Sequence, residues 1–489
     1  MKKKPLVTAA ALAALLVSAL PLFAGARSQS GAAAAKPYEI VWHVGAGEGA
    51  QTDTPAVLAE VNKYLAGTGL NATLKLVEAD FGNYNQKIQM VIASQEAYDL
   101  CYTASWINNY TDNVAKNAFL PLDDLLPQYA PQLWNDVPAG GWDACRVKGR
   151  IYGVPNQQIW AYTKGPAIAK SWAERYGYTK ADIKTVADLE DLMAKVKADN
   201  PNMYPFNTVA GGVVNNLLDP IDVIVANVGY YLTDNSLKIL NINETPEMVA
   251  QMKRARDWYL KGYIRPDVAT LIEATNDFQT GRTIIGWDGN VKPGGETEGF
   301  NRSGVEMWTI PFSQSWLTTS GITATITAVS RQSRNPETVV KFLNLVNTDK
   351  ALYTLITRGI EGRHYRKIDS NYVEFIPNSG YMPSVDWMFG SVFNSYLLPG
   401  QDLTVWEDTV KVNNSAIPSP LIGFVLDPTP IQTEIANVTA VWDEYKNLWD
   451  GSVDFDRTYP AYLAANRAAG VDRIITEIQR QVDEWKKTK

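Results

Sequence analysis

Early in the chain, hydrophobic positions switch repeatedly between the spacing of a strand and the spacing of a helix. The apolar runs 38–47 and 98–103 and the alternating run 72–80 each predict a strand. Between them, residues 54–69 and 84–98 place apolar side chains three and four positions apart, which predicts two helices. Strands that alternate with helices of this length are typical of βαβ units and a mostly parallel sheet. Ligands of such sheets bind beyond the carboxyl ends of the strands.

A second α/β unit follows in the middle of the chain. Its first helix, over residues 185–201, begins with a capping box. Residues 280–296 predict a short strand that runs into a glycine-rich loop, and the β-branched run 321–330 predicts another strand. A helix over residues 335–346 begins with an asparagine cap followed by proline, and the chain is helix-rich from about residue 427 onward.

The N-terminal segment carries the features of an export signal. Three lysines precede an apolar run over residues 5–23, and an A-x-A sequence follows it. These features predict a secretory signal peptide over residues 1–26 and a flexible linker over residues 27–35. A membrane anchor is the alternative, but the alanine-rich core and the loose sequence after it favour the signal peptide. No cysteine stands at the cleavage region, so we expect a soluble protein, without a lipid anchor, in the periplasm or another extracytoplasmic compartment.

The composition narrows the range of partners and cofactors. The chain has 489 residues, 46% of them hydrophobic, which is enough for at least two cores of ordinary domain size. Its formal net charge is −7, and the loss of the three signal-peptide lysines would make it −10, which argues against nucleic acid as a partner. With two histidines and two cysteines dispersed along the chain, we expect no metal site and no cofactor. The sequence leaves open whether Cys101 and Cys145 form a disulfide or stay free.

Several stretches, taken in order, are similar to one known family. They are the hinge-like segment 149–155 ("GRIYGVP"), the segment 276–289 ("NDFQTGRTIIGWDG"), the strand and helices of residues 328–365, and the helical tail between residues 423 and 485. Together they resemble family 1 extracellular solute-binding proteins of ABC importers, the maltose-binding-protein-like group. The tail is similar to the extra C-terminal helical domain of a largely lipoprotein-like subset, although this chain has no lipobox cysteine.

The resemblance implies an α/β fold that forms a two-lobed, type II-like clamp. Each lobe would have a central, mostly parallel sheet flanked by helices, and a helix-rich extension would end the chain. The N-lobe would hold residues 36–153 and 313–359, and the C-lobe would hold residues 154–312 and 360–489 with the extension. The resemblance also implies a monomer that captures a carbohydrate, an oligosaccharide in this family's usual range, by hinge closure. It would deliver this ligand to an ABC transporter permease in the membrane.

A sugar presents an apolar C–H face and a rim of hydroxyl groups, so its site needs flat aromatic side chains and hydrogen-bonding partners. The chain has 15 Trp and 24 Tyr, more than core packing would normally recruit. Any one of these could pack in a core, but the polar loop around Trp106 and the glycine-rich loop around Trp287 favour contact with a ligand. The residues that we expect to bind ligand are Tyr84, Trp106, Asn108, Trp160, Tyr162, Trp287, Asp288, and, as a charged pair, Arg358 and Glu361.

Two other functions would use a similar sequence. A secreted glycoside hydrolase would share the aromatic residues but needs two carboxylates across the sugar bond. Asp288 with Glu361, or Glu296 with Glu298, could be nominated, yet 52 acidic residues make some pair inevitable. The sequence has no eightfold strand–helix repetition, no GxSxG or HExxH motif and no P-loop, so we do not expect an enzyme. A peptide-binding protein on the same clamp is the remaining alternative.

Overall fold

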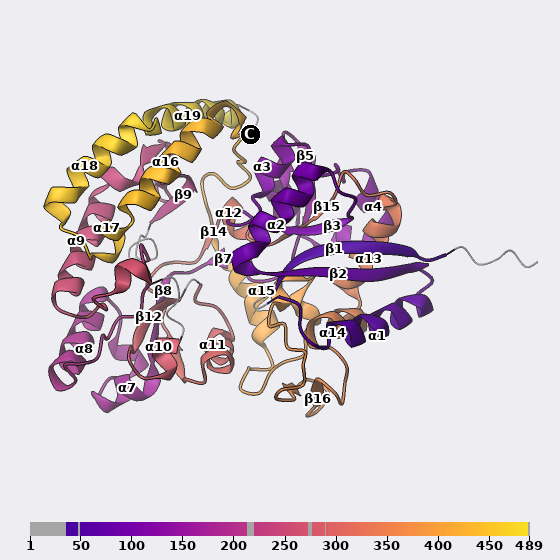
Figure 1. Cartoon of the computed structure of the whole chain (residues 1–489), viewed down its shortest axis with the longest axis horizontal. Coiled ribbons are helices and arrows are strands. Elements are labelled where there is room, and N and C mark those ends of the chain that lie inside the picture. Colours follow the sequence, from indigo (N-terminus) through magenta and orange to yellow (C-terminus); the bar gives the residue numbers. More distant parts are fainter. Residues whose placement is uncertain (1–35, 47–48, 213–219, 272–275, 289, 488–489) are drawn as a thin grey trace, which may run out of the picture. The chain divides into compact units, whose positions relative to one another are not determined.

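The computed structural model describes residues 36–46, 49–212, 220–271, 276–288 and 290–487 (Figure 1). Three clusters of buried hydrophobic side chains organise this part of the chain. We call the regions built around the first two clusters the first lobe and the second lobe. Within the described residues, none of the helices combines the length and the hydropathy that crossing a membrane requires.

The first lobe is built on a five-stranded sheet with the order β2-β1-β3-β15-β6 (Figure 1). β1 pairs in parallel with β2 and with β3, which confirms the predicted βαβ units. β15 runs antiparallel to both β3 and β6. The carboxyl ends of β1, β2 and β3 therefore meet at one edge of the sheet. The strands are β1 (Tyr38–Ala46), β2 (Ala72–Asp80), β3 (Leu100–Thr103), β6 (Gly153–Pro155) and β15 (Ile326–Val329).

The helices of the first lobe bury the faces that the hydrophobic spacing predicted. α1 (Thr54–Gly67) has a proline in its first turn and buries Val57, Val61 and Leu65. α13 (Pro336–Thr348) begins after Asn335, which caps the helix as the sequence predicted. The other helices are α2 (Phe81–Ser94), α3 (Tyr110–Ala115), α4 (Leu125–Tyr129), α5 (Pro131–Asp136), α6 (Ala139–Ala144) and α14 (Lys350–Arg358), with a hairpin of β4 (Arg146–Val147) and β5 (Arg150–Ile151).

The second lobe has a three-stranded sheet in which β8 (Gly165–Ala169) lies between β12 (Ile285–Asp288) and β13 (Met307–Thr309). Both pairs are antiparallel, so the expected mostly parallel sheet is wrong for this lobe. Hydrophobic periodicity identifies a strand but does not fix its direction, which depends on where the long connection after β8 returns to the sheet. Close pairing requires Gly165, because a Cβ there would lie 1.8 Å from the carbonyl oxygen of Ile310.

The helices of the second lobe cover this sheet. α8 (Val186–Asp199) begins with the predicted capping box, in which the side chains of Thr185 and Asp188 each bind the other residue's backbone N–H. Its buried face agrees with the predicted spacing. The remaining helices are α7 (Lys170–Arg175), α9 (Pro246–Leu260), α10 (Asn276–Gln279) and α11 (Gly295–Ser303), with 3-10 turns at Lys180–Asp182, Ile242–Glu244 and Val268–Thr270.

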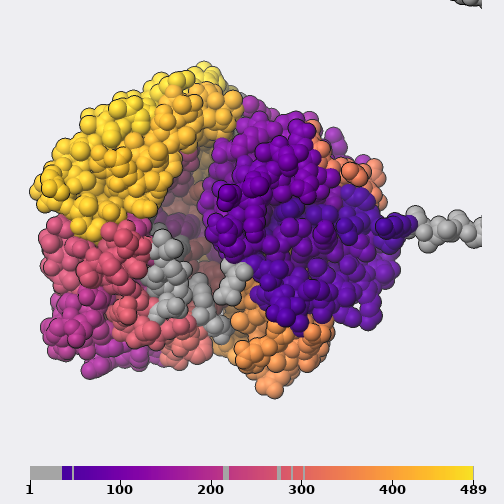
Figure 2. Space-filling model, viewed as in Figure 1, coloured from indigo at the N-terminus to yellow at the C-terminus, as the bar shows by residue number. Residues whose placement is uncertain are grey.

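The C-terminal helices form the region that Figure 2 shows as a continuous yellow surface. They contribute Leu448, Trp449 and Tyr462 to the core of the second lobe. A third core cluster joins them to the antiparallel sheet β11-β10-β9. These elements are α16 (Gln432–Tyr445), α17 (Asn447–Asp450), α18 (Phe455–Ala468), α19 (Val471–Lys486), β9 (Ile221–Val225), β10 (Val228–Tyr231) and β11 (Leu240–Asn241).

Residues 381–389 belong to the first core, although we expected everything after residue 360 in the C-lobe. Tyr381, Met388 and Phe389 are buried there, and the Phe389 ring meets Trp42 edge to face at 5.1 Å between centroids. The chain thus crosses back to the first lobe once more than the predicted boundaries allow. The remaining elements are β7 (Ala161–Tyr162), β14 (Trp316–Leu317), α12 (Thr319–Ile322), β16 (Tyr365–Lys367), β17 (Val373–Phe375), α15 (Val405–Ser415) and β18 (Ile417–Pro418). Further 3-10 turns lie at Asp386–Met388, Val392–Asn394 and Thr429–Ile431.

Candidate functional site

Aromatic side chains gather at the carboxyl edge of the first sheet. Phe81 directly follows β2 and Trp106 follows β3, and their ring centroids lie 6.1 Å apart. This agrees with the expectation that segments after parallel strands meet at one edge. Trp106 is 55% exposed, so much of its ring is open to solvent.

Two further rings complete this group. Trp387 stacks on Phe81 with centroids 5.9 Å apart and an interplanar angle of 12°, and it lies 6.4 Å from Trp106. Tyr102 is buried beneath them and meets both tryptophans edge to face, at 6.2 Å and 5.8 Å. We call Phe81, Tyr102, Trp106 and Trp387 the aromatic platform. Flat aromatic faces of this kind are what the apolar face of a sugar requires.

Hydrogen bonds fix the platform to the neighbouring strand connection. The indole N–H of Trp106 donates to the carbonyl oxygen of Ala324 at 2.8 Å, and the hydroxyl of Tyr102 donates to the same oxygen at 3.0 Å. Because this carbonyl precedes β15, the platform is tied to the segment where the chain returns to the first lobe. The exposed ring of Trp106 is therefore held in place although it is not buried.

Asn108 shapes the loop that carries Trp106, and its side chain is buried. Its backbone has a φ of 46°, a left-handed conformation that asparagine tolerates better than most residues. Its amide donates to the carbonyl oxygen of Tyr102 at 2.7 Å and accepts from Gln89 at 2.9 Å and Asn113 at 2.8 Å. These bonds occupy the side-chain amide that we expected to face ligand hydroxyls. In the structure, Asn108 instead positions the loop that carries Trp106.

A glycine makes room for the platform in β1. A Cβ on Gly45 would lie 2.8 Å from Cε1 of Phe81, closer than real side chains approach. The ring of Phe81 therefore lies directly over the backbone at the end of this strand. Glycine at this position is a packing requirement of the platform rather than a turn signal.

Arg358 stabilises the turn that carries Trp387 by binding the residue before it. Arg358 is 5% exposed, and its guanidinium donates to Asp386, the residue before Trp387, at 2.6 Å. The guanidinium carbon of Arg358 also lies 5.0 Å from the centroid of the Phe375 ring. Glu361, the expected partner of Arg358, instead forms an ion pair with Lys367 at 2.9 Å. Arg358 and Glu361 therefore do not pair with each other, because Gly359 ends α14 and the chain turns away before Glu361. That they bind ligand stays a prediction.

A pocket of about 150 Å³ lies beside the loop of Trp106. Residues within the ranges 105–112, 222–230, 319–323 and 421–428 line it, so first-lobe loops face β9, β10 and the segment that leads into the C-terminal helices. A cavity of about this volume can hold one six-membered ring. The pocket and the platform share the loop after β3, because Ser105 lines the pocket and Trp106 belongs to the platform.

The polar side of the pocket is formed around Asp222. The hydroxyl of Tyr230 donates to its carboxylate at 3.0 Å and lies 2.8 Å from the hydroxyl oxygen of Ser419. Burial raises the pKa of Asp222, although the hydrogen bond from Tyr230 and the nearby charge of Lys164 oppose the shift. Burial also raises the pKa of Asp112, the second carboxyl group that lines the pocket. The pocket thus offers both hydrogen-bonding groups and apolar side chains to a ligand.

The remaining predicted residues are not members of the platform, although the ring of Tyr84 lies 6.2 Å from that of Tyr102. Tyr84 is buried, and its hydroxyl donates to the carbonyl oxygen of Tyr102 at 2.6 Å. Trp160 is also buried, and its N–H donates to the carbonyl oxygen of Asn156 at 2.9 Å. These two side chains belong to the first core.

On the second lobe, Tyr162 is half-buried in β7 and Trp287 is half-buried in β12. Trp287 meets Phe312 edge to face at 6.0 Å, and its indole N–H is buried without a hydrogen-bond partner among the described residues. The backbone of Asp288 pairs with Gly165, whereas its side chain lies outside the described part of the structure. The second-lobe candidates therefore stay predictions.

The sequence reasoning did not single out Phe81, Trp387 or Asp222. Phe81 stands in the same "DFGNYN" stretch as Tyr84, and the position directly after the predicted strand could have pointed to it. Trp387 comes from a short 3-10 turn late in the chain, and no local pattern connects it to residue 106. Its place at the site depends on the extra crossing of residues 381–389 into the first lobe.

The two cysteines and the acidic residues add no further centre to the described residues. Cys101 and Cys145 are both buried and free, so they do not form a disulfide in this structure. Burial raises the pKa of the Cys101 thiol to about 12, which keeps it protonated at neutral pH. In the described ranges, no three His, Cys, Asp or Glu side chains are grouped so that they could hold a metal ion.

Comparison with known proteins gives two family matches. The family described as bacterial extracellular solute-binding protein matches residues 31–352, and a domain of unknown function (DUF3502) matches residues 420–487. A carbohydrate ABC transporter substrate-binding protein of Streptococcus pneumoniae serotype 4 is 24% identical over 443 residues, which cover 88% of this chain and 88% of that protein.

Solved structures of solute-binding proteins have the same fold. The N-glycan transport solute binding protein from Streptococcus pneumoniae has a TM-score of 0.81 at 22% identity, over 91% of this chain and 98% of that chain. The Streptococcus pneumoniae substrate binding protein FusA, in complex with kestose, has a TM-score of 0.64 at 13% identity, over 92% of this chain and 100% of that chain. These likenesses establish the two-lobed α/β fold.

Proposed function

Because the chain belongs to the bacterial extracellular solute-binding protein family, we propose that it captures an oligosaccharide and delivers it to the permease of an ABC transporter. The observation that carries the proposal is the aromatic platform, with Trp106 55% exposed, beside a polar pocket large enough for one ring. The platform would take the C–H face of one sugar unit, and the pocket would take the hydroxyl groups of a neighbouring unit.

The names of related proteins support a carbohydrate as the ligand. The curated relative is named as a carbohydrate transporter component, and structurally similar chains are named in complexes with Man5GlcNAc and with kestose. Identities of 13% to 24% do not carry over a particular sugar. The names of these proteins favour a carbohydrate over a peptide as the ligand, and a transport role over an enzymatic one.

Ligand-driven closure is the mechanism that this arrangement supports. A ligand shifts a protein between two conformations only by its difference in affinity for them, so it must contact both lobes. The pocket meets this condition. Ser105 and Asn109 come from the first lobe, whereas Asp222 and Tyr230 come from β9 and β10, whose Ile221 and Tyr231 pack in the second core. A sugar bound to Trp106 alone would gain nothing from closure.

We further propose that the protein acts outside the cytoplasm as a soluble monomer. Residues 1–26 would serve as a signal peptide and residues 27–35 as a linker. We keep residues 36–153 and 313–359 as the first lobe and add residues 381–389, which pack in its core. The absence of a cysteine at the cleavage region supports release without a lipid anchor.

The proposal is tested by titrating residues 27–489 with Man5GlcNAc, kestose, a series of maltooligosaccharides and short peptides while tryptophan fluorescence is recorded. We expect a saturable change with at least one oligosaccharide. Because two carboxyl groups, Asp112 and Asp222, line the pocket, the ligand is also recovered and analysed. Intact ligand supports binding for transport, whereas cleaved ligand would assign a glycoside hydrolase, and saturation by peptides alone would discard the carbohydrate.

A further inference from the structure

Residues 421–428 form one side of the pocket and are also the first residues of the C-terminal domain, which spans residues 420–487. We call residues 421–428 the wall segment. Leu421, Phe424 and Leu426 are buried in the third core cluster, together with the C-terminal helices. The intervening Val425 packs against the first core and also lines the pocket. The wall segment is thus an apolar surface held between the first lobe and the C-terminal helices.

One end of the wall segment is fixed by α12. The hydroxyl of Thr319 donates to the carbonyl oxygen of Leu421 at 3.3 Å and accepts from the N–H of Gly423 at 2.9 Å. Thr319 itself lines the pocket. The start of the segment is therefore set by α12, which also contributes Thr319 and Ser320 to the pocket.

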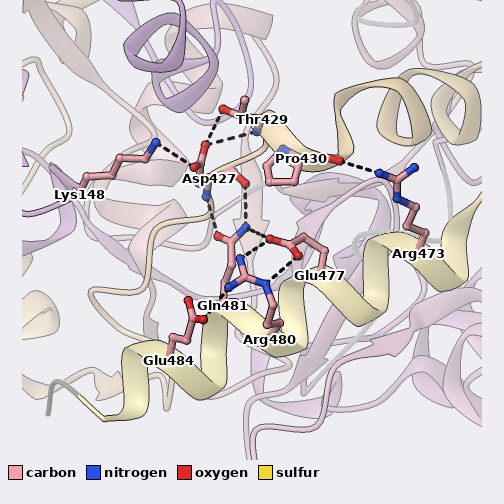
Figure 3. Close-up of polar contacts among 9 residues, drawn as sticks. All are labelled: Lys148, Asp427, Thr429, Pro430, Arg473, Glu477, Arg480, Gln481 and Glu484. Carbon is pink, nitrogen blue, oxygen red and sulfur yellow. Dashed lines mark hydrogen bonds and ion pairs between the residues drawn. The ribbon is translucent and has the colours of Figure 1, made fainter.

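The other end is fixed by α19, as Figure 3 shows. The backbone N–H of Asp427 donates to the side-chain oxygen of Gln481 at 2.9 Å, and the side-chain amide of Gln481 donates back to the carbonyl oxygen of Asp427 at 2.9 Å. The same amide also donates to Glu477 at 2.8 Å. Gln481 does not line the pocket, so any effect that it has on a ligand must pass through the wall segment.

The side chain of Asp427 adds a contact to the first lobe. Its carboxylate forms an ion pair with Lys148, in the turn of the β4–β5 hairpin, at 2.9 Å and accepts from the Thr429 hydroxyl at 2.7 Å (Figure 3). Burial alone would raise the pKa of Asp427, but the hydrogen bond from Thr429 and the ammonium group of Lys148 outweigh it and lower the pKa. The carboxylate is therefore charged at neutral pH, and the ion pair persists there.

We propose that the C-terminal domain serves to place the wall segment, and that α19, through Gln481, thereby sets the affinity for the carbohydrate. The apolar side chains of Phe424, Val425 and Leu426, which line the pocket, would cover the C–H face of the bound ring. This inference rests on the proposed function. The C-terminal domain would thus act on ligand binding indirectly, because its helix α19 holds the wall segment in place through Gln481, which does not line the pocket.

The test compares two glutamines of α19. Gln481→Leu removes both hydrogen bonds to Asp427. Gln479→Leu removes a matched pair, because Gln479 accepts from the N–H of Ile239 at 2.9 Å and donates to the carbonyl oxygen of Leu237 at 3.3 Å. Residues 237 and 239 do not line the pocket. The two variants therefore lose the same kind of contact from the same helix, and only one of them releases the wall segment.

We expect both variants to show a similar, small fall in the melting temperature. Calorimetric titration with the oligosaccharide that saturates the wild type should give an approximately tenfold weaker Kd for Gln481→Leu and an unchanged Kd for Gln479→Leu. Equal Kd values for Gln481→Leu and the wild type, or equal losses in both variants, would overturn the inference while leaving carbohydrate binding intact.

A second variant covers the case in which Gln481→Leu does not fold. Val425→Ser changes a half-buried side chain of the wall segment itself. We expect Val425→Ser to weaken the binding of the same oligosaccharide several-fold, because an apolar contact with the ring is lost. An unchanged Kd in a folded Val425→Ser protein would also overturn the inference. If the wild type binds no carbohydrate at all, the proposed function fails and the inference fails with it.

Discussion

At the scale of single residues, exposure separates the side chains that can meet a ligand from those that position them. Trp106 was predicted from its polar loop, and the structure leaves it exposed. Tyr84, Asn108 and Arg358 were predicted by the same reasoning but are buried and hydrogen-bonded. A sequence shows that a polar or aromatic residue stands near a strand end, but whether its side chain points outward depends on neighbours that are distant in sequence. For Arg358 that neighbour is Asp386.

His43 in β1 makes folding stability sensitive to pH. Burial lowers its pKa from 6.5, while the charge of Glu96 raises it and that of Lys75 lowers it further. Because the folded pKa lies below the unfolded value, the unfolded chain takes up a proton first as the pH falls through 6.5. The contribution of neutral His43 is therefore fully present above pH 6.5 and is lost progressively on acidification towards its folded pKa.

We expect a His43→Gln variant to lose less of its stability than the wild type between pH 7.5 and pH 5.5, roughly the range in which an ordinary histidine titrates. Urea unfolding at several pH values measures the free energy of unfolding of both proteins. Since every other ionisable group is the same in both proteins, the difference between the two curves isolates His43. Parallel curves across this range would contradict the prediction.

At the scale of elements, the strands and helices of the first lobe follow the sequence closely. Parallel pairing of β1 with β2 and β3 brings Phe81 and Trp106 to one edge, as the alternating pattern predicted. The sheet of the second lobe departs from the prediction, because its strands pair antiparallel after a long connection. Local periodicity carries information about element type and buried face, but not about strand direction over such a distance.

Gly45 in β1 lies against the Phe81 ring of the aromatic platform. Its replacement therefore tests whether this packing supports ligand binding. Gly45→Ala would place a Cβ 2.8 Å from the Phe81 ring, so the ring must shift and the platform must move with it. We expect a loss of about 1–3 kcal/mol in the free energy of unfolding and a weaker Kd for the oligosaccharide. Unfolding in urea and calorimetric titration measure the two effects.

The matched control is Gly67→Ala at the end of α1, where no atom lies within 4 Å of the added Cβ. This variant should keep the wild-type Kd and gain up to about 1 kcal/mol of stability, because alanine is favoured over glycine in a helix. A wild-type Kd in the Gly45→Ala protein would show that Phe81 does not support the platform.

At the scale of the whole molecule, the family and the order of the segments were predictable, but the site was only partly so. The quoted motifs pointed to the solute-binding family that matches residues 31–352. Trp387 and the wall segment lie far along the chain from Trp106, and only the folded structure brings them to the first lobe. The pocket depends on elements from several chain crossings, so its polar centre at Asp222 has no local sequence signature.

If the aromatic platform binds a carbohydrate, Trp106→Ala should weaken that binding. Trp106 is 55% exposed, so its replacement should leave the melting temperature nearly unchanged. Loss of a stacking residue of this kind should cost about 2 kcal/mol or more, which is roughly a thirtyfold weaker Kd. The control is Trp172→Ala on α7, which removes a half-buried tryptophan from the second lobe, away from the pocket lining.

Calorimetric titration of both variants with the saturating oligosaccharide is the measurement. We expect about a thirtyfold loss of affinity in folded Trp106→Ala and wild-type affinity in Trp172→Ala. Wild-type affinity in a folded Trp106→Ala protein would contradict this expectation.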